Sequence, residues 1–382
     1  MKKNDEDRKR CFMSHNATIV GIELYQADFE LAEPFVTSLA RITMAHNIIV
    51  RIYGSQGLYG TGEARPNPPV TGETQKAALA AGEELAPRLL GRPVSDIEGS
   101  VRLLHKGLLK NSALKSAFDI ALYDLLGKTA DLPLFALLGG ERRTVHTDNT
   151  VSLGAPEEMV AKARACKEQG FEAIKVKLGS TFEEDLYRME QIRGALGPQV
   201  ALRIDANQGW DRKTALRVLL ALEPLNIQYC EQPVAYWDYE SLRWIRDRVR
   251  IPIMADESVF GPQDAFKLAS SGCCDYLNIK FAKTGGIHEA LKVNAVAEAC
   301  GMACMVGCMT ESRLPLTAAA HFVSARPNIR FADLDGHLPM KEDPVTGGAS
   351  YRGGAISLPE TPGHGADYQE DFLARCPRIR VE

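Results

Sequence analysis

Several features are missing from this sequence, and each absence excludes a class of protein. No run of about 18 apolar residues is present, which argues against a membrane-spanning helix. Lys and Arg number 45 against 49 Asp and Glu, so the net charge of −4 offers no basic surface for nucleic acid or anionic lipid. Gly and Pro number only 32 and 20 in 382 residues, which excludes collagen and extended low-complexity disorder.

The cysteines lack the spacing of a disulfide framework. Nine are present, an odd number, and no CxxC pair occurs among them. Most stand in apolar stretches, so we expect buried thiols in a reduced compartment and neither disulfides nor a zinc site. Residues 1–16 are charged and are not followed by the apolar segment of a signal peptide. We therefore expect a disordered tail at 1–16 on a cytoplasmic protein.

The rest of the chain divides into two parts, of which residues 17–140 are the first. They begin with two strand-like runs, at 18–29 and 46–54. Helical periodicity follows, at 73–90, 94–108 and 112–130. Strands followed by helices predict an α+β domain.

From residue 141 the pattern changes to short β-branched runs that alternate with amphipathic segments, as in βαβ units. Eight such units in about 200 residues predict an α/β fold of the (β/α)8 barrel type over 141–345, with an active site at the carboxyl ends of the strands. Residues 346–382 are expected to pack back on the first domain. The predicted strands are 145–152, 173–178, 201–206, 227–231, 252–256, 276–280, 303–307 and 329–334.

Three carboxylates stand at the ends of three consecutive predicted strands: Asp205, Glu231 and Asp256. No His or Cys accompanies them, and hard oxygen ligands of this kind suit Mg²⁺. Their mutual repulsion would be costly without a cation. The alternative is that Asp205 and Asp256 cap the helices that follow. A set on three consecutive strands favours the metal site.

Lysines stand at the ends of the second and sixth predicted strands. Lys175 and Lys177 share one face because the strand period is two, and Lys280 lies four strands further round the ring. Lys177 and Lys280 should therefore face each other across the barrel mouth, where two bases can remove a proton from one side of a carbon and return it on the other. A lysine base needs a lowered pKa, which burial, the metal and the neighbouring Lys175 would favour. We expect Lys283, by contrast, to be a surface lysine in a salt bridge.

Together these residues resemble the enolase superfamily, and within it the muconate lactonizing enzyme subgroup. The segment GCMTESR lacks the catalytic His that the mandelate racemase subgroup would show at this place. The resemblance implies an α+β capping domain on the barrel, bound Mg²⁺ and a homo-oligomer. It covers the whole chain past the tail and rests on Lys175-x-Lys177, Asp205-x-Asn207, Glu231, Asp256-Glu257-Ser258, Lys280 and Gly285-Gly286-Ile287.

Asp333-Leu334-Asp335 resembles the D-x-D signature of dipeptide epimerases, where the pair binds the α-ammonium of a dipeptide. Geometry agrees, because strand eight lies opposite strand four and a ligand joining the two ends must carry a carboxylate at one end and a cation at the other. The alternative is a helix cap or a loop salt bridge. The resemblance also implies that Thr150 contacts substrate. The predicted substrate-binding residues are Asp333, Asp335, Thr150, Lys175, Asn207 and Met309.

The predicted activity is therefore Mg²⁺-dependent dipeptide epimerisation. Lys177 and Lys280 would exchange the α-proton of the C-terminal residue through a metal-stabilised enolate. The segments 35–42 and 66–71 should select the side chains of the substrate. The sequence does not show where Arg41 and Arg65 point, so it places no basic residue to pair an acidic substrate side chain. Dipeptides with small or hydrophobic side chains, such as alanyl dipeptides, are therefore favoured. Three alternatives stay open: another enolase-superfamily reaction such as lactonization or o-succinylbenzoate synthesis, a Schiff-base lyase using Lys177 or Lys280, and a non-catalytic barrel that binds small acids.

Overall fold

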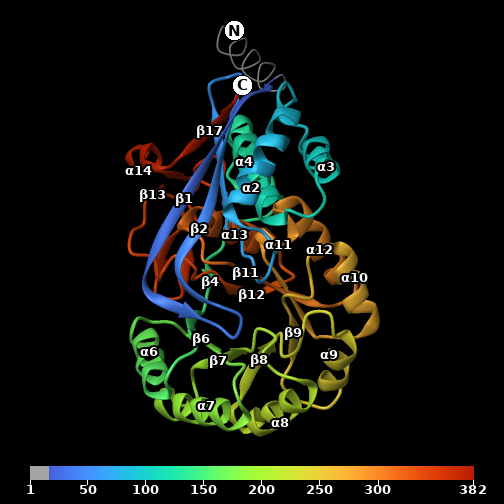
Figure 1. Ribbon diagram of the computed structural model, residues 1–382, viewed down its shortest axis with the longest axis vertical. Helices are drawn as coiled ribbons and strands as arrows, with labels where there is room; N and C mark the ends of the chain where they lie inside the picture. The colour runs from blue at the N-terminus through green and yellow to red at the C-terminus, as the bar shows by residue number, and fades with distance from the viewer. Residues whose placement is uncertain (1–16) are drawn as a thin grey trace.

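The computed structural model describes residues 17–382, and the tail predicted at 1–16 lies outside them. A first layer is an antiparallel sheet in which the long hairpin of β1 (Ile19–Val36) and β2 (Arg41–Gly54) is followed by β3 (Tyr59–Ala64). Its fourth strand, β17 (Arg378–Val381), pairs with β1, so the end of the chain returns to this sheet (Figure 1).

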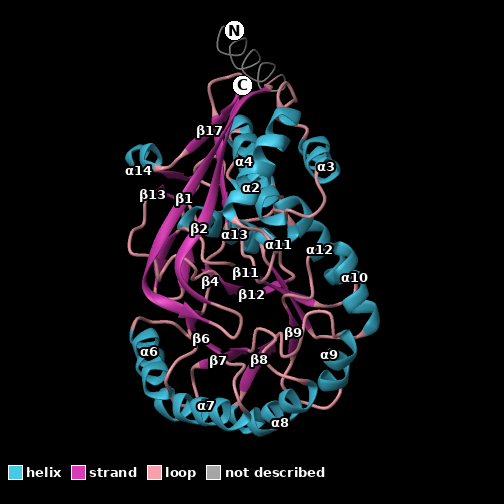
Figure 2. Cartoon of the chain, viewed as in Figure 1, coloured by secondary structure: helices cyan, strands magenta, loops and turns pink. Residues whose placement is uncertain are grey.

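Helices pack on this sheet in the upper part of the molecule (Figure 2). The predicted helix at 73–90 begins later, because the Thr74 hydroxyl caps it by accepting the Ala77 N–H, and its last turn is tighter where Pro87 removes a donor. The longest helix, α4, approaches β3 so closely that a Cβ at Gly60 would lie 2.0 Å from the Ala121 carbonyl oxygen. The helices are α2 (Gln75–Leu85), η1 (Ala86–Leu89), α3 (Ile97–Gly107), α4 (Ser112–Ala130) and α5 (Leu134–Leu137).

The second layer is an 8-stranded parallel sheet whose strands follow one another in chain order. A bridge between Thr147 and Ala332 brings its first and last strands together, so the sheet is a nearly closed barrel, as predicted. The strands are β5 (Asn149–Val151), β6 (Ala173–Lys177), β7 (Ala201–Asp205), β8 (Ile227–Glu231), β9 (Ile253–Ala255), β10 (Tyr276–Ile279), β11 (Ala303–Gly307) and β12 (Ile329–Asp333).

Helices connect these strands and line the outside of the barrel (Figure 1). The described chain has no helix between β12 and the small strands of the C-terminal segment. The connecting helices are α6 (Pro156–Glu168), α7 (Phe182–Leu196), α8 (Arg212–Leu222) with η2 (Glu223–Leu225), α9 (Tyr239–Arg246), α10 (Pro262–Ser271), α11 (Phe281–Thr284), α12 (Ile287–Ala299) and α13 (Arg313–Ala325).

The single strand predicted at 145–152 is wrong, because the structure divides it in two. β4 (Val145–His146) pairs with β15 (Ala355–Ser357) outside the barrel, and only β5 joins the barrel sheet. The chain changes partner between them, where the Thr147 N–H donates to the Gly354 carbonyl and Asp148 turns inward to pair with Arg203 at 2.8 Å. A buried ion pair at this point holds the bend.

The C-terminal segment contributes to both layers. Besides β15 and β17 it forms β13 (Val345–Gly347), β14 (Ser350–Arg352), β16 (Ala366–Tyr368) and α14 (Glu370–Arg375). β14 and β15 extend the β4 pairing, the Tyr351 hydroxyl of β14 donates to the Leu334 carbonyl just after β12, and β17 joins β1, so the segment touches the barrel as well as the first sheet. The boundaries 17–140, 141–345 and 346–382 stay predictions.

Two further expectations concern composition. The cysteines among residues 17–382 are free, and most are buried or partly buried, but the prediction is wrong for Cys300, which is exposed just after α12. Within the same residues, none of the helices combines the length and the hydropathy needed to cross a membrane.

Candidate active site

A cavity of about 1370 Å³ lies at the carboxyl ends of the barrel strands. Its roof is the tip of the β1–β2 hairpin, which reaches from the first sheet over the barrel (Figure 1). The tip is tied down by the Ser38 hydroxyl, which donates to the carbonyls of Ala206 (2.9 Å) and Asn207 (2.8 Å), and by the Leu153 N–H, which donates to the Val36 carbonyl (2.9 Å). Both layers of the fold therefore contribute to one site.

The three predicted metal ligands meet beside this cavity, which Asp256 lines. Asp205 and Glu231 end β7 and β8 in register, and Asp256 follows β9. Carboxylate oxygens of the three lie within 4.8 Å of one another, and all three side chains are buried. The helix-cap alternative is wrong, because Asp211 caps α8 and α10 begins after Gly261.

The chemistry of this carboxylate triad fits a hard divalent cation. Glu231 Oε2 and Asp256 Oδ1 are buried, and each lies against a lysine ammonium group, that of Lys175 at 2.8 Å and that of Lys283 at 2.5 Å. Burial and the neighbouring Asp205 carboxylate raise the pKa of Glu231 to about 8, because three acids in one dry site repel each other as anions. A cation bound by Asp205, Glu231 and Asp256 would offset their negative charge and remove the repulsion.

The two predicted bases line the cavity on opposite sides of the ring, since β6 and β10 are four strands apart. Lys177 Nζ lies 2.6 Å from Asp205 Oδ2, its cross-strand neighbour, and Lys280 Nζ lies 2.9 Å from Asp256 Oδ2. Lys175 is more deeply buried, with Nζ 3.2 Å from Asp205 and 2.8 Å from Glu231. The three ammonium groups therefore border the carboxylate triad.

The expectation of a lowered pKa for the lysine bases is not met for Lys280. Burial by itself lowers the pKa of Lys280, but the Asp256 and Glu231 carboxylates outweigh burial and raise that pKa well above its usual value. The pKa of Lys175 is raised in the same way, because the carboxylates of Asp333, Glu231 and Asp205 outweigh the effect of burial. These acids include the predicted metal ligands, whose negative charge a divalent cation would offset.

Sequence reasoning missed Lys283 and Asn278. The prediction that Lys283 is a surface lysine is wrong, because the one-turn helix α11 brings Lys283 Nζ to 2.5 Å from Asp256 Oδ1, fully buried. Asn278 donates from Nδ2 to Glu231 Oε1 at 2.8 Å. The strand period of two puts Asn278 on the same face as Lys280 and could have identified it. The Lys280-x-x-Lys283 spacing of one helical turn could have indicated that Lys283 lies near Lys280.

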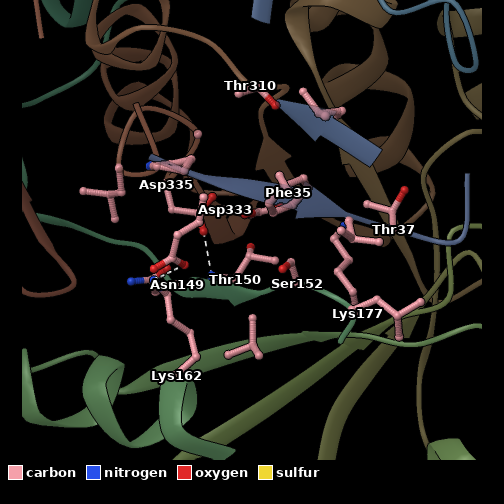
Figure 3. A pocket seen from close by; sticks show the side chains of 18 of the residues that line it. Phe35, Thr37, Asn149, Thr150, Ser152, Lys162, Lys177, Thr310, Asp333 and Asp335 are labelled. Atoms are coloured by element: carbon pink, nitrogen blue, oxygen red, sulfur yellow. Dashed lines mark hydrogen bonds and ion pairs between the residues drawn. The ribbon is translucent and has the colours of Figure 1, made fainter. Parts of the chain in front are cut away.

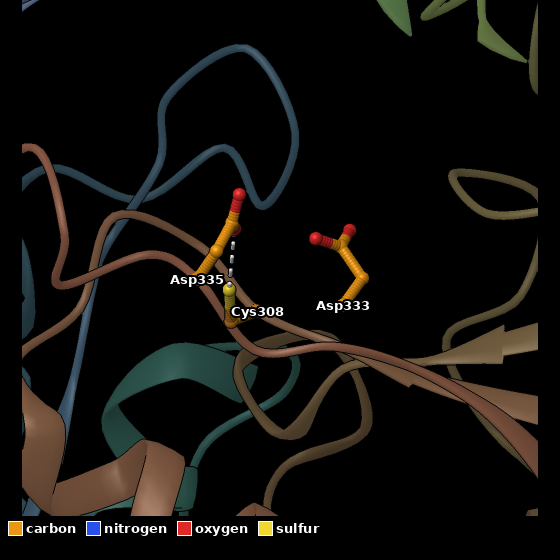
Figure 4. Close-up of side chains that lie close together, drawn as sticks. All are labelled: Cys308, Asp333 and Asp335. Carbon is orange, nitrogen blue, oxygen red and sulfur yellow. Dashed lines mark hydrogen bonds between the residues drawn. The ribbon is translucent and has the colours of Figure 1, made fainter. Parts of the chain in front are cut away.

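Asp333 and Asp335 reach the same cavity from the end of β12. Asp333 Oδ2 lies 2.7 Å from Lys175 Nζ, and Asp335 Oδ2 accepts the Thr150 N–H at 2.6 Å (Figure 3). Cys308 Sγ lies 4.0 Å from Asp335 Oδ1 (Figure 4). Since β12 is followed by no helix in the described chain, the helix-cap alternative is wrong, and the salt bridge of Asp333 is internal.

The two aspartates differ in charge behaviour. Burial and the Asp333 carboxylate raise the pKa of Asp335 to about 7. Burial acts in the same direction on Asp333, but Lys175 and Lys280 hold the pKa of that carboxyl well below its usual range. Two acids held together in this way favour a bound cationic group, which stabilises both as anions.

The remaining predicted residues also line the cavity. Thr150 pairs with Lys175 in the β5–β6 register, Asn207 donates from Nδ2 to Glu257 Oε1 at 3.1 Å, and Met309 Sδ lies 3.6 Å from Asn67 Nδ2. Both segments that were expected to select the substrate side chains contribute to the lining of the cavity. The lining residues from 35–42 and 66–71 are Phe35, Val36, Thr37, Leu39, Ala40, Arg41, Ile42, Asn67, Pro69 and Val70.

The two arginines of these segments differ in position. Arg41 lines the cavity, whereas Arg65 is buried at the end of β3, where burial lowers its pKa to about 10. Phe35, which the sequence did not single out individually, places its ring centroid 5.9 Å from Lys177 Nζ. An aromatic side chain therefore covers one of the predicted bases.

Comparison with known proteins decides the family. Residues 158–372 match the model described as enolase C-terminal domain-like, and residues 19–139 match the mandelate racemase/muconate lactonizing enzyme N-terminal domain. The chain belongs to the enolase superfamily. Both the predicted family and the predicted fold, a capping domain on a barrel, are confirmed.

Relatives within the superfamily are similar over nearly their whole length. The D-Ala-D/L-Ala epimerase of Cytophaga hutchinsonii is 45% identical over 365 residues, 95% of this chain and 99% of that protein. The hydrophobic dipeptide epimerase of Enterococcus faecalis is 41% identical over 330 residues, 86% of this chain and 93% of that protein. The structure of the C. hutchinsonii dipeptide epimerase complexed with Mg and D-Ala-L-Val has a TM-score of 0.94 at 44% identity, covering 96% of this chain and 100% of that one.

Proposed function

We propose that this protein is a Mg²⁺-dependent dipeptide epimerase that inverts the α-carbon of the C-terminal residue. The observation that carries the proposal is one cavity lined by two lysines from opposite strands, by Asp256 of the carboxylate triad and by an acidic pair. The names of the relatives support the same reaction class.

The chain's own residues divide the work of proton transfer. Mg²⁺, when held by the triad, supplies positive charge to the substrate carboxylate and so acidifies the adjacent α-C–H. Lys177 and Lys280 then act from opposite faces: the neutral one accepts the α-proton, and the protonated one returns a proton to the other face. Lys175 does not reach the carbon in this scheme. It binds Asp205, Glu231 and Asp333 and keeps those acids in place.

The acidic pair accounts for recognition of the other end of the substrate. Asp333 and Asp335 line the cavity across the ring from the triad, and an α-ammonium bound there sets the substrate's length. A dipeptide carries a carboxylate at one end and an ammonium group at the other, which matches a metal site and an acidic pair that share one cavity. Charged groups at the two ends of the cavity therefore select substrates that carry both a carboxylate and an ammonium group, and they fix the orientation of the bound substrate.

We propose that the protein prefers dipeptides with hydrophobic side chains. Phe35, Ile42, Val70 and Leu338 line the cavity between the charged groups. The basic side chain of Lys162 is already paired with Glu33 at 3.5 Å. A neutral apolar substrate side chain therefore needs no charged partner from Lys162, and Arg41, which also lines the cavity, is exposed to solvent. We also propose that the protein is cytoplasmic and forms a homo-oligomer.

Deuterium exchange tests the reaction directly. The Mg²⁺-loaded protein, incubated in D₂O with a library of L,L-dipeptides, should incorporate one deuterium at the C-terminal α-carbon of apolar members, with the epimer appearing in parallel. Mass spectrometry and ¹H NMR measure both. Exchange with no dipeptide at all would contradict the proposed function.

Asp335→Asn tests the recognition of the ammonium group. Loss of one charge-assisted contact should raise KM for an apolar dipeptide by about thirtyfold with a much smaller change in kcat. Steady-state kinetics by polarimetry measure the two constants. An unchanged KM would favour a substrate without an ammonium group, as in lactonization or o-succinylbenzoate synthesis.

A further inference from the structure

Asp335 stands beyond the last hydrogen-bonded residue of the barrel sheet. β12 ends at Asp333, which is in register with Gly307 of β11. On its other side, β12 meets the start of the barrel only through the bridge between Thr147 and Ala332. The sheet therefore does not fix the direction of Asp335, and other contacts must do so.

Two hydroxyl groups hold the peptide units on either side of Leu334, the residue between the two aspartates. The Leu334 N–H donates to Thr147 Oγ1 at 2.8 Å, and the Leu334 carbonyl accepts the Tyr351 hydroxyl at 3.0 Å. Thr147 Oγ1 in turn donates to the Asp148 carbonyl at 3.1 Å, which directs its lone pairs toward Leu334. Both the donor and the acceptor of Leu334 are thus satisfied by side chains from other segments.

The supporting side chains are themselves held in place. Thr147 is 3% exposed and is anchored by its own N–H to the Gly354 carbonyl. The Tyr351 ring lines the cavity and packs on His337, with ring centroids 4.3 Å apart. Tyr351 belongs to β14, whose partner β15 pairs with β4, and Thr147 directly follows β4, so the two hydroxyls come from one small sheet and the residue next to it.

The residues after Leu334 are closely packed, so they cannot shift to restore the position of Asp335 if the Leu334 backbone rotates. A Cβ at Gly336 would lie 2.2 Å from the Met309 carbonyl oxygen, so this segment sits directly against the segment that carries Met309. Asp333 and Asp335 repel each other as anions. Rotation of the Leu334 backbone would let Asp335 turn away from Asp333 and from the Thr150 N–H.

We propose that Thr147 and Tyr351 are positioning residues for substrate recognition: by fixing Leu334, they hold Asp335 beside Asp333 so that both acids receive one ammonium group. This inference rests on the proposed function. Neither hydroxyl touches the reacting carbon. Their effect is confined to the part of the substrate that carries the positive charge.

The test compares two ligands that differ only in the ammonium group. The ligands are an alanyl-amino acid and the corresponding propionyl-amino acid, measured as substrate and as competitive inhibitor of the Mg²⁺-loaded protein. In the wild type the alanyl ligand should bind more tightly. Tyr351→Phe and Thr147→Val should each reduce this preference about tenfold while changing the affinity for the propionyl ligand less than twofold.

Matched variants separate positioning from general destabilisation. Thr147→Ser keeps the hydroxyl and should keep the wild-type preference. Tyr53→Phe removes a tyrosine hydroxyl bound to Glu23 Oε2 at 2.6 Å, far from the cavity, and should leave the preference unchanged. Parallel loss of affinity for both ligands, or an unchanged preference in Tyr351→Phe and Thr147→Val, would overturn the inference. Absence of exchange or of ammonium preference in the wild type would instead overturn the proposed function.

Discussion

Lys280→Met should lower the rate of epimerisation roughly 10²- to 10⁴-fold, the range expected for loss of a general acid–base group. The same variant should still exchange the α-proton of one stereoisomer in D₂O, because Lys177 remains on the opposite face of the barrel mouth. Lys177→Met should show the reverse selectivity. Deuterium incorporation into each pure diastereomer, followed by ¹H NMR, distinguishes the two variants.

The physical basis of this asymmetry is the position of each lysine in the ring. β6 and β10 are four strands apart, so a carbon between Lys177 and Lys280 presents one face to each. Methionine keeps most of the side-chain volume. The remaining ion pairs of Asp205 with Lys175 (3.2 Å) and of Asp256 with Lys283 (2.5 Å) keep these acids partnered.

Lys292→Met is a suitable control, since this lysine lies on α12 and pairs with the Glu289 carboxylate at 2.7 Å outside the cavity. Its rates should equal those of the wild type. If both site variants retained epimerisation, or if both lost exchange with the same stereoisomer, the two-base assignment would be wrong.

Removal of the metal should have the second large effect. Dialysis against EDTA should abolish exchange, and added Mg²⁺ should restore it. Binding should also raise the melting temperature of the wild type, because a ligand at about 100 times its Kd stabilises the folded state by about 2.7 kcal/mol. Asp256→Asn should lose both effects, since it removes one of the three carboxylates of the triad. Activity assays and thermal unfolding measure the two effects separately.

The control for this experiment is Asp247→Asn, an exposed acid at the end of α9. It should keep the Mg²⁺-dependent rise in melting temperature. Turnover that survives EDTA, together with a substrate adduct trapped by borohydride on Lys177 or Lys280, would instead support the Schiff-base alternative.

Much of the site followed from sequence periodicity. In a parallel barrel every strand delivers its last residues to the same end, so reading the polar residues at the predicted strand ends was enough to collect Asp205, Glu231, Asp256 and the D-x-D pair. Asp256, Asp333 and Asp335 line the cavity, and carboxylate oxygens of Asp205 and Glu231 lie within 4.8 Å of one of Asp256. Their assigned roles stay predictions that the experiments above address.

Other parts required contacts between distant segments. Lys283 was predicted to be a surface lysine, yet α11 places its ammonium group against Asp256. The predicted strand at 145–152 changes partner at Thr147 because β15, more than 200 residues later, competes for its first half. The raised pKa values of Lys175 and Lys280 depend on acids from other strands.

By itself, the sequence determined the class of fold, the order of the strands and the kinds of charged group at their ends, because side-chain period and strand length are local properties. Only the tertiary structure decided which acids pair with which lysines, that the β1–β2 hairpin closes the cavity, and that Thr147 and Tyr351 hold Leu334. Those contacts join segments far apart in the chain, and their geometry depends on how two layers pack, which no local pattern encodes.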